Sequence, residues 1–250
     1  KDVSRVQRYT AQKALQYEAM TDTGICVLGD GHYSVTLKLE DIDYQLAPED
    51  DQQGIIEQYA QFINSFDAGQ SVQLTVVNRH LDRETLSKAV SLSPRGDGRD
   101  EYRWEYNDLI NARLAAGRNN TVTDKYVTIT VEADDFEHAT SVLARVATES
   151  IAQLRSVGGC RAERVSGEER VRLLHDILRP DQPFRFTYND LVGSTLTTKD
   201  VVSPWAIDFR ENPATITFSN EHDSYYQTLV LRDLPAWLSD RLMKDLSELT

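Results

Sequence analysis

The sequence is poor in cysteine, in glycine and in long hydrophobic runs, and each shortage excludes a class of protein. Its 250 residues include two cysteines, Cys26 and Cys160, which excludes a disulfide-rich secreted scaffold. We expect both to be buried thiols of a reducing compartment, although the count would also allow one structural disulfide. Uninterrupted apolar runs extend over a few residues only, so we expect no transmembrane segment.

Positive charge is also scarce. The chain has 27 Lys and Arg against 40 Asp and Glu, a formal net charge of −13. The basic residues are interleaved with acids, as in Glu163-Arg164, and form no basic patch. Because such a surface repels phosphates, we expect no direct binding of nucleic acid. The apolar content of 40% is enough for the core of one large domain or two smaller ones.

The 12 glycines form no phosphate-binding loop of the type Gly-x-x-x-x-Gly-Lys-Ser/Thr. Gly29-Asp30-Gly31 and Gly96-Asp97-Gly98 are instead interpreted as tight turns, since an aspartate there would repel phosphate. Arg95-Gly96-Asp97 would be an adhesion signal only in an extracellular loop, and nothing in the sequence indicates one. We therefore predict that this chain by itself holds no cofactor and is not an enzyme.

Hydrophobic periodicity predicts a mixed α+β fold. Residues 32–39 alternate polar and apolar side chains, as in a half-buried strand with Tyr33, Val35, Leu37 and Leu39 inward. Pro48 opens a helix whose buried stripe is predicted from its apolar positions. That stripe comprises Ile55, Ile56, Tyr59, Phe62, Ile63 and Phe66. Further strands are predicted at 25–28, 72–77, 125–131 and around 160–165, and further helices at 99–118, from 136 to about 154, and from 166 to 178.

The elements between residues 32 and 165 follow the order strand, helix, strand, and then the same again. This order predicts a ferredoxin-like βαβ–βαβ sandwich over residues 1–180, with the charged helix 99–118 inserted between the halves. Residues 181–250 are expected to be a smaller, incomplete α+β subdomain. It would comprise an irregular aromatic linker at 181–213, a hairpin of Ala214–Phe218 and Tyr225–Leu231, and a helix over Leu234–Leu249.

The inserted helix carries the residues most suited to binding a partner. Tyr102 and Tyr106 share a face, which we expect to be buried and to anchor the helix, whereas Arg103 and Trp104 fall off that face. An exposed Arg and Trp pair is typical of interface anchors, so Arg103 and Trp104 are the predicted partner-binding residues.

Two other groups of residues could carry chemistry. Glu221-His222-Asp223 is the densest carboxylate–imidazole cluster, but adjacent strand residues alternate faces and cannot easily hold one metal, so we interpret it as a solvated turn. This cluster, or alternatively the carboxylates Asp41 and Asp43, remains a candidate for an enzyme site assembled from dispersed residues. No catalytic, cofactor-binding or metal-binding residue is predicted with a defined local motif.

Several short motifs occur in an order that resembles a known family. They are Asn78-Arg79-His80-Leu81, Gly96-Asp97-Gly98, Tyr102-Arg103-Trp104-Glu105-Tyr106-Asn107, the strand 125–131, and the segment 229–238. The set resembles the N-terminal region of the conjugative-transfer ATPases of Gram-positive mobile elements, the TrbE/CagE class of type IV secretion ATPases. In that family the nucleotide-binding motifs lie C-terminal to this region. The first residue, Lys1, and the end at Thr250 directly after an amphipathic segment also lead us to expect a piece of a longer protein.

The resemblance implies a docking and assembly module without catalysis of its own. ATP and Mg would be used by another domain of the parent ATPase. The implied partners are inner-membrane subunits of a conjugation channel, with self-association through the parent ATPase, and the implied location is cytoplasmic, peripheral at the inner face of the membrane. The alternatives are a free-standing enzyme with a dispersed site and a protein–protein adaptor outside secretion.

Overall fold

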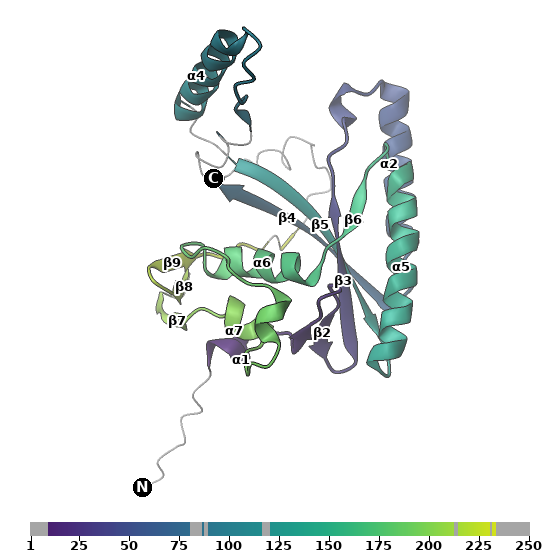
Figure 1. Cartoon of the computed structure of the whole chain (residues 1–250). Helices are drawn as coiled ribbons and strands as arrows, with labels where there is room; N and C mark the ends of the chain where they lie inside the picture. Colours follow the sequence, from purple (N-terminus) through teal and green to yellow (C-terminus); the bar gives the residue numbers. More distant parts are fainter. Residues whose placement is uncertain are drawn as a thin grey trace. The chain divides into compact units, whose positions relative to one another are not determined.

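The computed structural model describes residues 10–80, 87, 90–116, 121–212, 215–230 and 232–233. These residues divide into two compact units: the first runs to Leu74 and resumes at Tyr126, and the second lies between Thr75 and Lys125. Residues on both sides of the predicted 180/181 boundary fall in the first unit, and that boundary stays a prediction. The chain is a mixed α+β protein with antiparallel pairing between strands (Figure 1).

The larger sheet orders its strands β1-β2-β3-β5-β4, and β6 also pairs with β3. β2 pairs with the start of β3 through Cys26↔Ser34, and β6 pairs with its end through Leu39↔Ala162. The strands are β1 (Ala19–Met20), β2 (Cys26–Gly29), β3 (His32–Leu39), β4 (Gln70–His80), β5 (Thr121–Glu132) and β6 (Ala162–Arg164). The predicted hairpin across Gly29-Asp30-Gly31 is confirmed.

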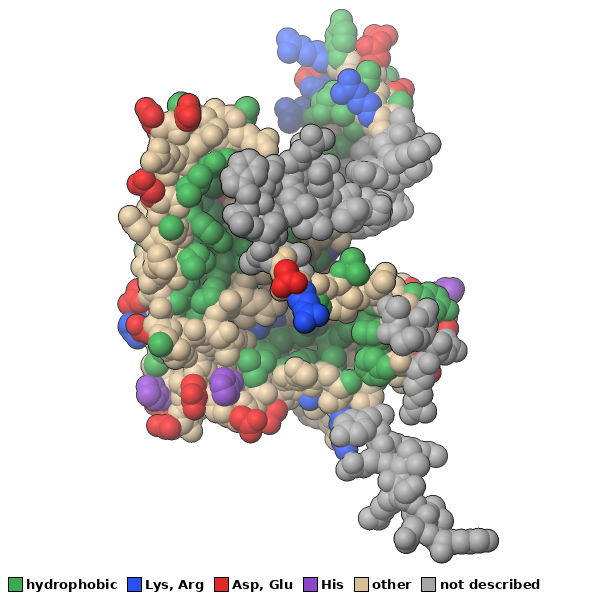
Figure 2. Space-filling view, turned by 180° about the vertical axis from the view of Figure 1, so that it is seen from behind, with side chains coloured by type: hydrophobic (Ala, Val, Ile, Leu, Met, Phe, Trp, Pro, Cys, Tyr) green, Lys and Arg blue, Asp and Glu red, His purple; other side chains and the backbone are tan. Residues whose placement is uncertain are grey.

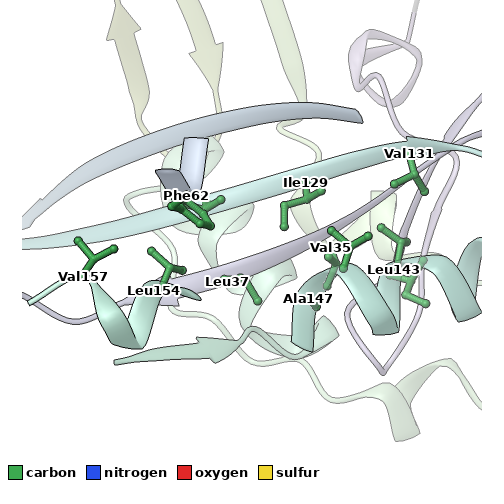
Figure 3. Packing of buried hydrophobic residues seen from close by; sticks show 12 residues of the cluster. Val35, Leu37, Phe62, Ile129, Val131, Leu143, Ala147, Leu154 and Val157 are labelled. Carbon is green, nitrogen blue, oxygen red and sulfur yellow. The ribbon is translucent and has the colours of Figure 1, made fainter. Parts of the chain in front are cut away.

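Two helices cover one face of this sheet, α2 (Glu49–Asn64) and α5 (Phe136–Ser156). α2 follows β3 and leads to β4, and α5 follows β5 and leads to β6, so the predicted strand–helix–strand order is confirmed. The sheet contributes Val35, Leu37, Ile129 and Val131 to the core beneath the helices, and Figure 3 shows them facing helix side chains. The helix contributions include Phe62, Leu143, Ala147 and Leu154. Complete burial of each such aliphatic side chain is worth about 1.5–3 kcal/mol.

The opposite face of the sheet is also covered, which the alternation in β3 did not predict. Ser34 and Thr36 are buried there, although the pattern predicts them on a solvated side. A second apolar cluster explains this, since it packs β1 and β2 against α6 (Gly167–Leu178) and α7 (Thr198–Val202). Its buried members are Tyr17, Met20, Cys26, Val171, Phe186 and Val202. The guanidinium of Arg170 lies beside it and donates to the carbonyl oxygens of Gly24 and Ser34 at 2.8 and 2.9 Å.

The segment 181–213, predicted to be an irregular linker, is regular in part. It contains the 3-10 helix η2 (Tyr188–Leu191), α7 and the strand β7 (Ala206–Asn212). Short capping boxes, such as Thr197 with Asp200, start the helical turns without any long apolar periodicity. β7 pairs with β8 (Thr215–Ser219) and β8 with β9 (Asp223–Tyr226), so the predicted hairpin is present in a shorter form. The predicted helix 234–249 lies outside the described residues.

Polar side chains cap the two helices, and the cysteines are thiols. Asp135 caps α5 by accepting from the N–H of His138 at 2.8 Å, and Ser166 with Glu169 forms a capping box at the start of α6. Both cysteines are buried thiols, as predicted, and Cys160 donates to the carbonyl oxygen of Glu40. Within the part of the chain that the structure describes, no helix has the length and apolar character needed to cross a lipid bilayer.

Candidate docking site on the inserted helix

The inserted helix α4 (Asp100–Ala116) lies in the second unit, between β4 and β5, and confirms the helix predicted over 99–118 apart from its ends. Residues 117–118 lie outside the described part. α4 is anchored by polar contacts to the segment before it. Asn107 exchanges two hydrogen bonds with the backbone of Leu92, at 2.8 and 3.0 Å. Asn111 accepts a hydrogen bond from the hydroxyl of Ser87 at 2.7 Å.

The turn into α4 is held by one carboxylate. Asp100 accepts hydrogen bonds from the backbone N–H groups of Arg95 and Gly96, both at 2.8 Å. Gly96 and Gly98 have φ of +67° and +74°, a region that favours glycine. The Arg95-Gly96-Asp97-Gly98 segment is therefore a structural turn, as predicted. Asp100 occupies the N–H groups that a phosphate would need.

Arg103 belongs to the same turn, so its side chain is less open than expected, and its role in binding a partner stays a prediction. Its guanidinium contacts both Asp97 and Asp100 at 2.5 Å, and its side chain is only 15% exposed. The hydrogen bonds from Arg103 lower the pKa of Asp97 to about 2, and those from the backbone of Arg95 and Gly96 lower the pKa of Asp100. We call this arrangement of Asp97, Asp100 and Arg103 the turn clamp.

The two tyrosines are exposed, so the prediction that they anchor α4 was wrong. The periodicity correctly placed them on one face with Leu109, since residues at i, i+4 and i+7 lie within an arc of about 60°. The periodicity could not show that polar contacts of Asp100 and Asn107 anchor the face of α4 opposite the tyrosines. The exposed fractions are 71% for Tyr102, 42% for Tyr106 and 53% for Leu109. We call these three residues the α4 stripe.

Trp104 is 58% exposed, as its predicted role requires, and it projects from α4 in a direction different from the stripe. None of the α4 side chains that the structure describes is buried. Large exposed aromatic side chains on a helix that polar contacts hold in place are typical of protein-binding surfaces, because they offer apolar area at little cost in conformational entropy.

The strands next to the insertion carry polar pairs that the sequence analysis did not find. Arg79 of β4 forms an ion pair with Asp124 of β5, and Asp124 is buried. The hydroxyl of Thr123 donates to the side-chain oxygen of Asn78 at 2.8 Å. Asn78 and Arg79 belong to one of the motifs that carry the family resemblance. Their contacts join the two strands that lead into and out of the insertion, which is a structural role.

The structure does not bring the other candidate residues together. Asp41 and Asp43 line a groove of about 540 Å³ with Asp50 and Asp51, but Glu221, His222 and Asp223 do not line it. Those three residues are exposed, which agrees with their interpretation as a solvated turn, and the N–H of His222 donates to Asp181. Among the residues that the structure describes, no group of three or more His, Cys, Asp or Glu side chains could hold a metal ion.

No protein-family model matches the sequence, and no curated protein matches it either. The function proposed for the chain is therefore supported by its own residues and by the resemblance of its short motifs.

The turn clamp predicts a shifted titration of Asp97. Because its pKa is lowered from 3.8 to about 2, the clamp stabilises the turn fully above pH 3.8 and is lost as the pH falls through about 2. Replacement of Arg103 by alanine should raise the midpoint of the Asp97 carboxyl resonance towards 3.8 in an NMR pH titration. Arg113→Ala, on the last turn of α4, is the matched control and should leave the midpoint unchanged. An unchanged midpoint in Arg103→Ala would contradict the clamp.

Proposed function

We propose that this chain is a non-catalytic docking and assembly domain of a conjugative-transfer ATPase of the type IV secretion class, involved in DNA or protein transfer. One structural observation carries the docking role: α4 presents Tyr102, Tyr106 and Leu109 exposed while polar contacts fix its other face. The motifs that resemble the ATPase family include the start of this helix, which supports the choice of family.

The strand order supports a ferredoxin-like arrangement for the larger sheet. The two strand–helix–strand units place their strands in the order β6-β3-β5-β4, with α2 and α5 on one face. This interleaving of two βαβ units is the arrangement expected for a ferredoxin-like sandwich. In it, α4 is an insertion in the connection between the two halves. A rigid sheet that carries an inserted helix is a suitable platform for a docking surface.

The proposed partners are inner-membrane subunits of the conjugation channel and other subunits of the parent ATPase. Binding would place the domain peripherally at the cytoplasmic face of the membrane. ATP and Mg would be handled by a separate domain of the parent protein. The net charge of −13 disfavours direct contact with the transferred nucleic acid, because phosphates would be repelled.

Purified chain should neither hydrolyse ATP nor gain thermal stability when ATP and Mg are added. The physical reason is that the sequence has no phosphate-binding loop and that Asp100 occupies the N–H groups of the Gly96 turn. Phosphate release and thermal unfolding, each with and without nucleotide, are the measurements, and a known ATPase is the positive control. Sustained turnover that survives a second purification would refute the non-catalytic role.

A further inference from the structure

A strip of apolar side chains lies exposed on the first unit, on the outer flank of α2 and on β4. The apolar pattern of α2 predicts one buried stripe, but only Ile55, Phe62 and Phe66 pack towards the core. The remaining members are exposed: Ile56 by 55%, Tyr59 by 43% and Ile63 by 43%, with Leu74 of β4 exposed by 52%. We call these four residues the edge strip. Figure 2 shows a lengthwise strip of hydrophobic side chains on one face of the molecule.

The edge strip is continuous because α2 and the start of β4 pack on the same core. Phe62 of α2 is buried in the cluster that Val72 of β4 also contacts. Leu74 lies two residues after Val72 and therefore points to the same face of the sheet. Tyr59 precedes Phe62 by three residues and Ile63 by four, so it neighbours both on the helix surface. Helix and strand thus present one apolar surface.

β4 is also the last strand in the order of the larger sheet, where the described strands pair it with β5 alone. The outer edge of such a strand presents unpaired backbone groups, and natural proteins protect these with lysine, proline or bulges. The first half of β4 lacks these protecting side chains, because residues 68–78 contain no charged residue and no proline. An uncharged edge next to an apolar helix flank is a surface built to pair with another strand.

The charge distribution indicates which partner fits. The chain has a net charge of −13, so most of its surface would repel a second copy. The edge strip is the exception, because Glu57 is the one charged residue between Gln52 and Phe66. Two copies of a neutral strip can meet without like-charge repulsion, and a two-fold axis brings the same residues together from both sides.

We propose that the edge strip is a self-association surface, on which β4 pairs antiparallel with β4 of a second copy and the two α2 flanks pack across the two-fold axis. The two sheets become one continuous sheet, and the exposed halves of Ile56, Tyr59, Ile63 and Leu74 are removed from water. This surface is distinct from the α4 stripe. If the chain does not dimerise through the edge strip, the proposed docking function of α4 is unaffected.

Analytical ultracentrifugation of the full chain tests the proposal. The species of 28.4 kDa should convert to twice that mass as the concentration rises into the range of about 1–100 μM, as expected for an interface of modest size. Leu74→Lys should weaken dimerisation at least tenfold, since it juxtaposes like charges at the pairing edge. Ile63→Lys tests the helix flank in the same way. Both side chains are about half exposed, so neither change should disturb the fold.

Two controls make the result specific. Val192→Lys introduces the same charge at an apolar residue that is exposed elsewhere in the first unit, and it should leave the dimer intact. Gln73→Cys should be cross-linked between copies by a short bismaleimide, because Cys26 and Cys160 are buried and should not react. Two results would overturn the proposal: a chain that stays at 28.4 kDa over the whole concentration range, or a dimer that both lysine variants leave unchanged. Either result would mean that the edge strip binds something other than a second copy.

Discussion

Replacement of Tyr102 and Tyr106 by alanine is expected to abolish binding of the domain to the channel partner proposed for it. Truncation of an aromatic interface anchor commonly costs about 2 kcal/mol or more, so each change should weaken binding roughly 30-fold. Both rings are exposed on α4, and the helix is held by Asp100 and Asn107 instead. The fold should therefore persist. Isothermal titration against the proposed partners, the cytoplasmic parts of the inner-membrane channel subunits, measures the effect.

The matched control for this pair is Tyr225→Ala with Leu229→Ala. Both side chains are well exposed, by 67% and 83%, but they lie in the first unit, after β8. Binding should be unchanged in this variant. Equal affinity of the α4 pair and the wild-type chain would show that the stripe does not bind the partner. Equal loss in both pairs would show that exposed apolar area in general drives a non-specific association.

Gly167→Ala is expected to cause the largest loss of stability of any single methyl addition in the chain's first unit. A Cβ at this position would lie 1.9 Å from the carbonyl oxygen of Thr21 and 2.4 Å from the hydroxyl of Tyr188. Neither neighbour can move easily, because the N–H of Gly167 bonds Asp22 and the Tyr188 hydroxyl bonds the carbonyl of Thr21. We expect a decrease in the free energy of unfolding of about 3 kcal/mol or more.

Gly54→Ala is the matched control, and it is expected to change the free energy of unfolding in the opposite direction. Gly54 lies within α2, and a Cβ added there meets nothing within 4 Å. Since alanine is favoured over glycine in a helix interior, the free energy of unfolding should rise by about 0.5–1 kcal/mol. Urea unfolding of both variants measures these two changes in the free energy of unfolding. A loss below 1 kcal/mol in Gly167→Ala would contradict the close approach of α6 to the 21–24 turn.

The order of elements in the larger sheet could be predicted from sequence because each has a strong local pattern. β3, α2 and α5 combine apolar periodicity with caps or turn residues at their ends, and these signals are local. β4 and β5 extend beyond their predicted bounds, from 72–77 to Gln70–His80 and from 125–131 to Thr121–Glu132. Their extensions are polar and are joined by pairs such as Arg79 with Asp124, which no apolar pattern reveals.

The exposure of apolar stripes could not be predicted from sequence. Periodicity shows which residues share a helix face, but whether another element covers that face depends on the tertiary arrangement. For this reason periodicity places the stripe of Tyr102 and Tyr106 inside the molecule and the whole apolar stripe of α2 in the core, although half of the α2 stripe is exposed. The role of Arg103 was missed for a related reason, since its two partners precede it in a turn. Both exposed stripes now carry the proposals for this protein.

The most direct test of the docking role is the frequency of conjugative transfer from donor cells. The cells would carry the Tyr102→Ala and Tyr106→Ala pair in the full-length ATPase to which this chain is proposed to belong. Transfer should fall at least 100-fold, as expected from the loss of about 2 kcal/mol at each of two anchors. ATP turnover of the purified parent protein and its level in the cell should stay unchanged. Normal transfer, or a loss of transfer matched by a loss of ATP turnover, would contradict a docking role for α4.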